Sequence, residues 1–340
     1  MKNILVIRLS SMGDVALTVP VLKAFSRQYP TVHITVLTRA FFVPMFQQIP
    51  NLTVIIPDLK KEHKGLLGLL RLYGLLKNTK RFDAIIDLHD VLRSIIVRNL
   101  FSLSGVPVFK VNKGRKAKKK ATAKSHSPIQ PLQHVTERYS DVFKKAGFNI
   151  DLNLYDFPKL PLSHKVQNFI QTKNKPLIGI APFAAYDTKM YPLDQMKQVA
   201  EQLAQNYDVL IFGGPAEKEI TEKIFTSIPN VHSVIGQFSL IEEMTLLQNL
   251  SLLVAMDSSN MHLARLVGTK VVSIWGATHP FLGFSPFNQF EKSLMVQIPV
   301  ETLPCRPCSV YGNQPCHRGD FACMKQIQPE NIIQRINIAI

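Results

Sequence analysis

Three short segments of the chain place acidic, hydroxyl and glycine residues directly after strongly apolar runs. The first is Ser10-Ser11-Met12-Gly13-Asp14, which follows the apolar run Lys2–Leu9. Ligands of open α/β sheets bind beyond the carboxyl ends of the strands, so Asp14 is placed to take a proton from a substrate hydroxyl. The alternative is that Asp14 only caps the following helix. The segment lacks the three spaced glycines of a dinucleotide fingerprint, which disfavours a nucleotide-dependent oxidoreductase.

The second segment runs from Asp257 to His262 (DSSNMH) after the apolar run Leu252–Met256. A helix that begins here offers unpaired backbone N–H groups and the positive end of its dipole, and both suit a diphosphate. The hydroxyls of Ser258 and Ser259 add donors, and His262 lies about one turn along the same helix. The alternative is an ordinary N-cap sequence followed by a core histidine.

The third segment is Gly213-Gly214-Pro215-Ala216-Glu217, again after an expected strand, Asp208–Phe212. Glycines allow a ligand to approach the backbone closely, and Glu217 can accept hydrogen bonds from ribose hydroxyls. Lys189 follows a further strand and can neutralise a leaving diphosphate. Considered alone, Lys189 is better explained as an ordinary surface lysine.

The elements that must position these segments alternate between strands and helices, which indicates βαβ units and doubly wound sheets. At 340 residues the chain exceeds one comfortable core, and the pattern restarts at the strand 177–181 after a proline-rich stretch, 151–166. We therefore expect an α/β protein of two Rossmann-like domains facing across a cleft. The expected divisions are residues 1–160, residues 161–328, and a closing helix, 329–340, that packs back on the N-terminal domain.

Basic residues are concentrated in one part of the chain, whose net charge is +16. There is no Asp or Glu from Val91 to Thr136, and eight lysines and arginines lie between Lys110 and Lys124. Such a tract cannot bury itself and is expected to be a solvated loop. Three roles stay open: a surface loop without a partner, a site for anionic lipid head groups or a phosphorylated acceptor, and, least favoured, nucleic acid.

The four cysteines, Cys305, Cys308, Cys316 and Cys323, lie close together near the end of the sequence. Their clustering favours a reducing compartment over a disulfide-stapled secreted fold. They could hold a structural zinc with four thiolates, but only half of the paired spacing of a zinc ribbon is present, so free or redox-paired thiols remain the alternative. We find no secretory leader and no apolar run of about 18 residues.

Five blocks, in this order along the chain, together resemble glycosyltransferase family 9, the ADP-heptose:lipopolysaccharide heptosyltransferases. The blocks are Ile7–Val15 with Thr18 and Pro20, Lys189–Pro192, Gly213–Glu217, Asp257–Ala264 and Ile274–Pro280. The resemblance covers nearly the whole chain. It departs from the family pattern at Ser259, where glycine is usual, and at Ala184 and Ala185, where hydroxyl residues are common.

The resemblance implies a GT-B fold with an N-terminal acceptor-binding domain and a C-terminal nucleotide-sugar-binding domain. It implies that Asp14 is the general base. It assigns donor binding to Lys189, Glu217, Asp257, Ser258, Ser259 and His262, to which we add Thr278. For the acceptor we expect contacts from Ser10, Ser11, Arg93, Lys116, Lys118, Lys119 and Lys120.

The implied reaction is a single inverting displacement at the anomeric carbon, without a catalytic metal. The expected donor is ADP-heptose and the expected acceptor the lipopolysaccharide inner core. We expect a cytoplasmic enzyme held at the inner membrane by electrostatics, with no nucleic-acid partner. The alternatives are a transferase that uses another nucleotide sugar and a catalytically silent sugar-nucleotide-binding protein of the same fold.

Overall fold

The computed structural model describes residues 1–123, 129–289 and 291–340. These residues form two compact units, and the chain passes between them at three places. The first unit contains residues 1–113 and 135–156, and the second contains residues 114–134 and 157–340.

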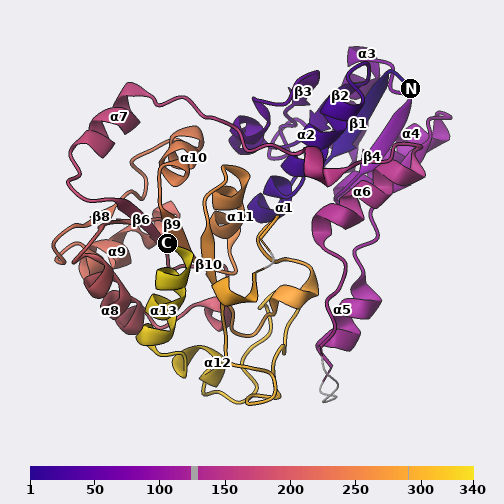
Figure 1. Ribbon diagram of the computed structural model, residues 1–340. Coiled ribbons are helices and arrows are strands. Elements are labelled where there is room, and N and C mark those ends of the chain that lie inside the picture. Colours follow the sequence, from indigo (N-terminus) through magenta and orange to yellow (C-terminus); the bar gives the residue numbers. More distant parts are fainter. Residues whose placement is uncertain (124–128, 290) are drawn as a thin grey trace. The chain divides into compact units, whose positions relative to one another are not determined.

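The first unit is built on a parallel sheet, whose strands within the described residues have the order β3-β2-β1-β4-β5 (Figure 1). The central strand β1 (Asn3–Ile7) is almost wholly buried, as expected of an apolar strand covered on both faces. The other strands are β2 (His33–Leu37), β3 (Leu52–Ile55), β4 (Ala84–Asp87) and β5 (Val108–Lys110). The helices are α1 (Met12–Ala16), α2 (Val19–Gln28), α3 (Gly65–Thr79), α4 (Leu92–Leu103) and α6 (Val135–Lys145).

Two of these helices, α3 and α4, cover the same side of the first sheet. Leu69 and Leu72 of α3 and Val97 of α4 belong to one buried apolar cluster with Leu5 and Ile85 of the strands. The close approach of α3 to the preceding loop requires Gly68, because a Cβ there would lie 2.4 Å from the carbonyl carbon of His63.

The second unit has its own parallel sheet, whose described strands follow the order β11-β10-β9-β6-β7-β8 (Figure 1). The strands are β6 (Leu177–Ala181), β7 (Asp208–Ile211), β8 (Val231–Ser233), β9 (Leu252–Met256), β10 (Val271–Ile274) and β11 (Met295–Val296). The helices are α5 (Arg115–Ala121), α7 (His164–Gln171), α8 (Leu193–Leu203), α9 (Lys218–Phe225), α10 (Leu240–Gln248), α11 (Ser259–Leu266), α12 (Ala322–Lys325) and α13 (Pro329–Ala339). The predicted restart of the α/β pattern at residue 177 is confirmed.

The closing helix does not follow its prediction, because α13 belongs to the second unit. Its Ile332 and Ile336 are buried in the core of that unit, which they share with α8 and β10. The ammonium group of Lys270 also donates to the carbonyl oxygen of Ala339, 2.7 Å away. The apolar face of α13 is therefore buried within the second unit.

The basic segment also differs from its prediction. Residues 115–121 form the helix α5 instead of a loop, and residues 114–134 group with the second unit although they precede the predicted boundary at 160. Lys118 is only 3% exposed, and its ammonium nitrogen lies 3.9 Å above the ring of Phe284, a cation–π contact. Further along, Leu132 N donates to Phe281 O at 2.8 Å. The charge pattern of the sequence could not predict these contacts, because they join residues about 150 positions apart. Lys124 lies outside the described residues.

No helix in the described part of the chain is long and apolar enough to cross a membrane.

Candidate functional site

Asp14 lies just beyond the carboxyl end of β1, in the first turn of α1. Its Oδ2 is 2.5 Å from Nη2 of the buried Arg8 and accepts a hydrogen bond from Ser11 Oγ at 2.9 Å. The N-cap residue of α1 is Ser11, not Asp14. Arg8 is itself fixed by a 2.6 Å hydrogen bond from Nη1 to Leu88 O. The carboxylate is thus oriented by a guanidinium and a hydroxyl, and it remains partly exposed.

Sequence reasoning missed His89, which stands beside this segment. Its Nε2 lies 3.3 Å from Ser10 Oγ, and its ring is nearly buried. Burial, with the nearby charge of Arg8 next in importance, lowers the pKa of His89 to about 3, so the imidazole is neutral at physiological pH. Its Nδ1 has no hydrogen-bond partner among the described residues. The rule that located Asp14 could have found His89, because His89 directly follows the largely apolar run Phe82–Leu88.

The loop that carries His89 is held by hydrogen bonds and ion pairs with Asp87 and Arg98. The Oδ1 atom of Asp87 accepts from the backbone N–H groups of His89 and Asp90, both at 2.9 Å. The buried Arg98 then pairs with Asp87 at 2.7 Å and with Asp90 at 2.8 Å. Arg93, predicted to contact the acceptor, is exposed near the start of α4.

In the second unit, three predicted donor-binding residues meet at the carboxyl ends of neighbouring strands. Lys189 follows β6, Asp257 follows β9 and Thr278 follows β10. Asp257 Oδ2 lies 2.9 Å from Lys189 Nζ and accepts a hydrogen bond from Thr278 Oγ1 at 2.8 Å. This cluster places a cation and a hydroxyl at the edge of the sheet where an α/β fold binds its ligand.

Ser258, Ser259, His262 and Glu217 complete the predicted donor residues. Ser258 is the N-cap of α11 and Ser259 its first residue, while His262 is buried one turn along. The Ser258 Oγ and Glu217 Oε2 atoms are buried without a hydrogen-bond partner in the described residues. Unsatisfied buried oxygens are costly, so both retain hydrogen-bonding capacity that a polar ligand can use. Glu217 lies against Gly214, where a Cβ would approach its Oε2 to 2.8 Å.

Arg306 is a second residue that sequence reasoning missed. It is buried, and its guanidinium donates to the carbonyl oxygens of Gly276, Trp275 and Thr278 at 2.6, 2.9 and 3.1 Å. Burial lowers its pKa to about 10, which leaves it charged at neutral pH. Arg306 therefore holds the loop after β10 in the form that presents the Thr278 hydroxyl to Asp257. It lies between Cys305 and Cys308, in a segment where the sequence predicted a role only for the cysteines.

The four cysteines are free thiols. Burial raises the pKa of Cys308, and the neighbouring Cys305 and Cys316 raise it further. Burial also raises the pKa of Cys323 to about 11. Among the residues that the structure describes, no group of three or more His, Cys, Asp or Glu side chains is arranged to hold a metal ion. The thiols are close enough to influence one another, but they do not form a ready metal site.

Gly312 leaves room for the side chain of Lys189, which packs against it. Its φ is +79°, and a Cβ added there would lie 2.4 Å from Lys189 Cδ. We expect Gly312→Ala to displace the lysine from Asp257 and to weaken nucleotide-sugar binding about tenfold, the loss of one charge-assisted hydrogen bond. Isothermal titration with the nucleotide sugar measures this.

Gly319→Ala is the matched control for this prediction. Gly319 has a φ of +75° but open space around its Cβ position. Both variants should lose about 1–2 kcal/mol of stability, because an L-residue is strained in the left-handed region. Only Gly312→Ala should lose affinity. Equal affinity in the two variants would show that Lys189 accommodates the methyl group without leaving Asp257.

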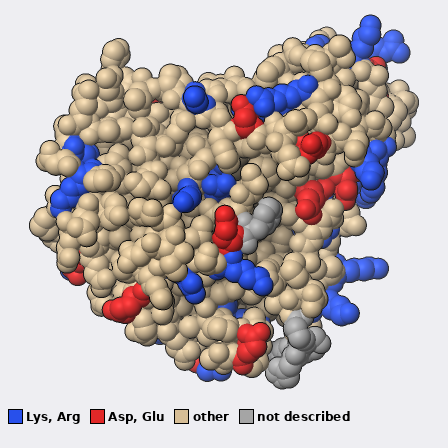
Figure 2. All heavy atoms as spheres, in the orientation of Figure 1, with Lys and Arg blue, Asp and Glu red and all other residues tan. Residues whose placement is uncertain are grey.

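The basic helix α5 presents most of its cations to solvent. Lys116, Lys119 and Lys120 are exposed, whereas Lys118 is buried against Phe284. Figure 2 shows Lys and Arg side chains projecting at the place of α5 in Figure 1. Of the four lysines predicted to contact an anionic acceptor, three are available and Lys118 instead fixes the helix to its own unit.

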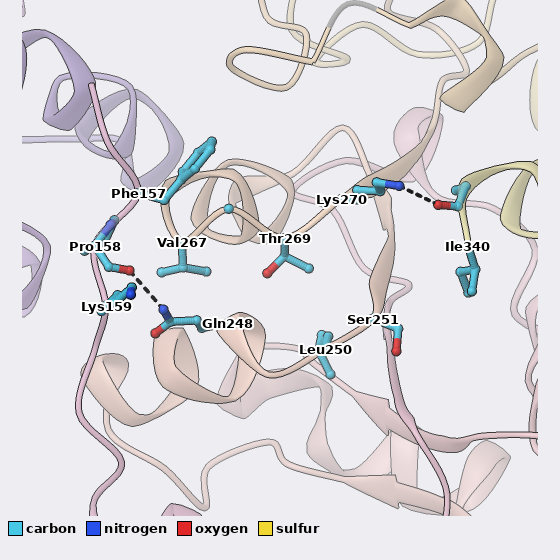
Figure 3. Close-up of a pocket in the computed structure, with 12 residues that line it drawn as sticks. Phe157, Pro158, Lys159, Gln248, Leu250, Ser251, Val267, Thr269, Lys270 and Ile340 are labelled. Carbon is cyan, nitrogen blue, oxygen red and sulfur yellow. Dashed lines mark hydrogen bonds between the residues drawn. The ribbon is translucent and has the colours of Figure 1, made fainter. Parts of the chain in front are cut away.

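A pocket of about 510 Å³ in the second unit lies away from the predicted donor-binding residues. Its lining includes Leu250, Ser251 and Lys270, which precede β9 and β10, so it is at the amino ends of the strands. Figure 3 shows Phe157 and Pro158 on one side of it and Ile340 on the other. None of the predicted donor residues lines this pocket, since they follow the carboxyl ends of the same strands.

Two parallel α/β sheets with polar clusters beyond their carboxyl ends are the arrangement of the GT-B fold, and comparisons with known proteins show the family. The family model described as glycosyltransferase family 9 (heptosyltransferase) matches residues 70–312. Since this is more than half of the sequence, the chain belongs to that family and is a glycosyltransferase.

Individual relatives span nearly the whole chain. Lipooligosaccharide heptosyltransferase 2 of Campylobacter jejuni is 25% identical over 335 residues, 96% of this chain and 95% of that protein. The glycosyl transferase family 9 structure from Veillonella parvula is 20% identical with a TM-score of 0.76, covering 99% of this chain and 97% of the other. The E. coli ADP-heptose lps heptosyltransferase II structure is 19% identical with a TM-score of 0.69, covering 99% and 98%. These structures share the fold.

Proposed function

We propose that this enzyme transfers heptose from ADP-heptose to the inner core of lipopolysaccharide with inversion at the anomeric carbon. The observation that carries the proposal is the convergence of Lys189, Asp257 and Thr278 at the carboxyl ends of β6, β9 and β10. The names of the Campylobacter and E. coli relatives support heptose as the sugar, and the E. coli name supports ADP as its carrier.

In the proposed reaction the Asp14 carboxylate takes the proton of an acceptor hydroxyl while that oxygen attacks the anomeric carbon. The bond from this carbon to the diphosphate breaks, and ADP leaves with the bonding electrons. Lys189 and the N-terminus of α11 stabilise the negative charge that develops on the leaving group. Glu217 accepts hydrogen bonds from the ribose, and Ser258, Ser259 and His262 bind the diphosphate and the sugar.

The residues near Asp14 have supporting parts in this proposal. Arg8 orients the carboxylate, and Ser10 and Ser11 contact the acceptor. Neutral His89 can donate or accept one hydrogen bond at the Ser10 hydroxyl. The reaction as written needs no catalytic metal. Elemental analysis of the purified protein tests the structural zinc. About one zinc per chain would support a zinc bound by the cysteines, and a fully folded protein without metal would overturn it.

The direct test is transfer from a panel of nucleotide sugars to a heptose-deficient lipopolysaccharide acceptor, with product detected by mass spectrometry. The proposal expects ADP-heptose to be used at least tenfold better than the other nucleotide sugars. Efficient transfer from a different donor would support the other transferase considered above. Donor binding without transfer to any acceptor would support the catalytically silent alternative.

We further propose that Lys116, Lys119 and Lys120 recognise phosphates and carboxylates of the acceptor. Replacing all three by Ser is expected to raise the acceptor KM about tenfold at low salt and less as salt rises, because exposed charges are screened. The matched control replaces Lys218, Lys223 and Lys325, three exposed lysines of the same unit, by Ser. Steady-state kinetics with a water-soluble core oligosaccharide measures the difference. Equal KM values for the two variants would remove α5 from acceptor binding.

We also propose that the enzyme works on the cytoplasmic side of the inner membrane, bound peripherally, with no nucleic-acid partner. The acceptor's lipid anchor and the net charge of +16 support this location.

A further inference from the structure

Helix α3 carries leucines on its buried side and also on part of its exposed side. One side packs into the core through Leu69, Leu72 and Leu76. Toward solvent it exposes Leu66, Leu67 and Leu70, which lie within about 100° of one another around the helix and which we call the leucine face. Leu67 is 71% exposed and Leu66 is 62% exposed. A surface helix of a soluble domain normally turns polar residues to water, so this arrangement leaves an apolar surface without a partner in the described residues.

The neighbouring helix α4 also exposes leucines. It packs on the same side of the sheet as α3, and the hydroxyl of Tyr73 on α3 hydrogen-bonds that of Ser104, which follows α4. Leu92 and Leu103, the first and last residues of α4, are 72% and 86% exposed. Apolar side chains are therefore exposed on both helices that cover this side of the sheet.

The charged residues within α3 and next to it in the sequence, from Lys64 to Arg81, are all Lys or Arg. From His63 to Phe82 the chain has no Asp or Glu, while Arg71 and Lys77 lie in the helix. Lys64 precedes α3, and Lys80 and Arg81 follow it. Leucines bordered by lysine and arginine are the composition of a helix that lies in the head-group region of an anionic bilayer. A second copy of the chain would bring these like charges together, which disfavours self-association through this face.

We propose that the leucine face of α3 is a membrane-contact surface that inserts into an anionic lipid bilayer. The leucines enter the boundary between head groups and acyl chains, and the flanking cations bind lipid phosphates. This inference rests on the proposed function, because an enzyme that glycosylates a lipid-anchored acceptor must work at a bilayer. It differs from the role proposed for α5, since α3 contributes apolar insertion and α5 contributes charge alone.

The test compares wild type with a triple variant, Leu66→Gln, Leu67→Gln and Leu70→Gln. Glutamine keeps helix propensity, and the three side chains are exposed, so thermal unfolding should be nearly unchanged. The matched control replaces Leu154, Leu162 and Ile220, which are exposed in other parts of the chain, by Gln. Binding is measured by sedimentation with vesicles of phosphatidylglycerol and phosphatidylethanolamine, at low and at high salt.

We expect the α3 variant to bind vesicles at least tenfold more weakly than wild type, and the control to bind like wild type. Part of the wild-type binding should survive high salt, because apolar insertion is not screened. Turnover with a water-soluble acceptor should be the same for all three proteins. Unchanged vesicle binding of the α3 variant overturns the inference. It is equally overturned if wild type is a dimer by analytical ultracentrifugation and the variant a monomer with wild-type vesicle binding.

The same experiment separates this inference from the proposed function. Loss of vesicle binding in the α3 variant, together with no transfer activity in wild type, supports the membrane surface and overturns the proposed transferase. Normal transfer with vesicle binding that ignores the leucines supports the transferase and overturns the membrane surface.

Discussion

Asp14→Asn is expected to bind the donor as wild type does and to transfer sugar about 100- to 10,000-fold more slowly, the usual contribution of a general base. The amide has nearly the same shape and can still accept the hydrogen bond from Ser11, but it cannot take up a proton. Because Asp14 is paired with Arg8, the change also leaves that buried guanidinium without its carboxylate, so some stability should be lost.

The measurement is single-turnover transfer with saturating donor, beside donor affinity by titration. Thermal unfolding shows how much of the loss is structural. Glu62→Gln, an exposed acid of the same unit, is the control and should keep wild-type rates. If Asp14→Asn retains more than about a tenth of the wild-type rate, Asp14 orients Arg8 and Ser11 and is not the base.

Lys189→Ala is expected to weaken donor binding and to slow transfer about 100- to 1000-fold, since the lysine stabilises charge that grows as the diphosphate leaves. The variant also leaves the carboxylate of Asp257 with Thr278 as its remaining partner in this cluster, which places an uncompensated negative charge where the diphosphate should bind. Both effects oppose the donor, so kcat and donor affinity should fall together.

The control for this prediction is Lys197→Ala, which removes a partly exposed lysine that pairs with Glu201 on α8. A double variant, Lys189→Ala with Asp257→Asn, tests the electrostatic part of the argument. It should recover donor affinity relative to Lys189→Ala alone, because the uncompensated charge is gone. Wild-type donor affinity in Lys189→Ala would place the lysine outside the donor site.

The α/β class and most of the strands could be predicted from the sequence, because parallel strands buried on both faces appear as unbroken apolar runs. The strands β6, β7 and β9 begin and end within a residue or so of their predicted positions. Asp257 was predicted because it directly follows a buried apolar run, and Lys189 because it lies in the loop after the strand 177–181. Thr278 was added with the family resemblance, and the structure brings the three together.

What the sequence did not reveal depends on long-range contacts. Arg306 acts through main-chain oxygens about 30 residues away, and no local pattern marks that partnership. In the sequence Lys118 is one of several neighbouring charges, whereas in the structure its ammonium group lies over the rings of Phe284 and Tyr311. Helix α1 was missed because its five residues, Met12–Ala16, are too few to show a helical period.

The assignment of residues 114–134 to the second unit makes the two units interleaved along the chain. During synthesis the first unit cannot be completed until residues 135–156, which include α6, have emerged. By then the segment 114–134 has already been made, while the Phe281 and Phe284 that it packs against have not. This basic segment is therefore made about 150 residues before its docking site, which takes roughly 8 to 30 seconds at about 5–20 residues per second. The first unit can therefore fold before the second only with this segment looped out, and a fragment ending at residue 160 would carry α5 without the surface that receives it.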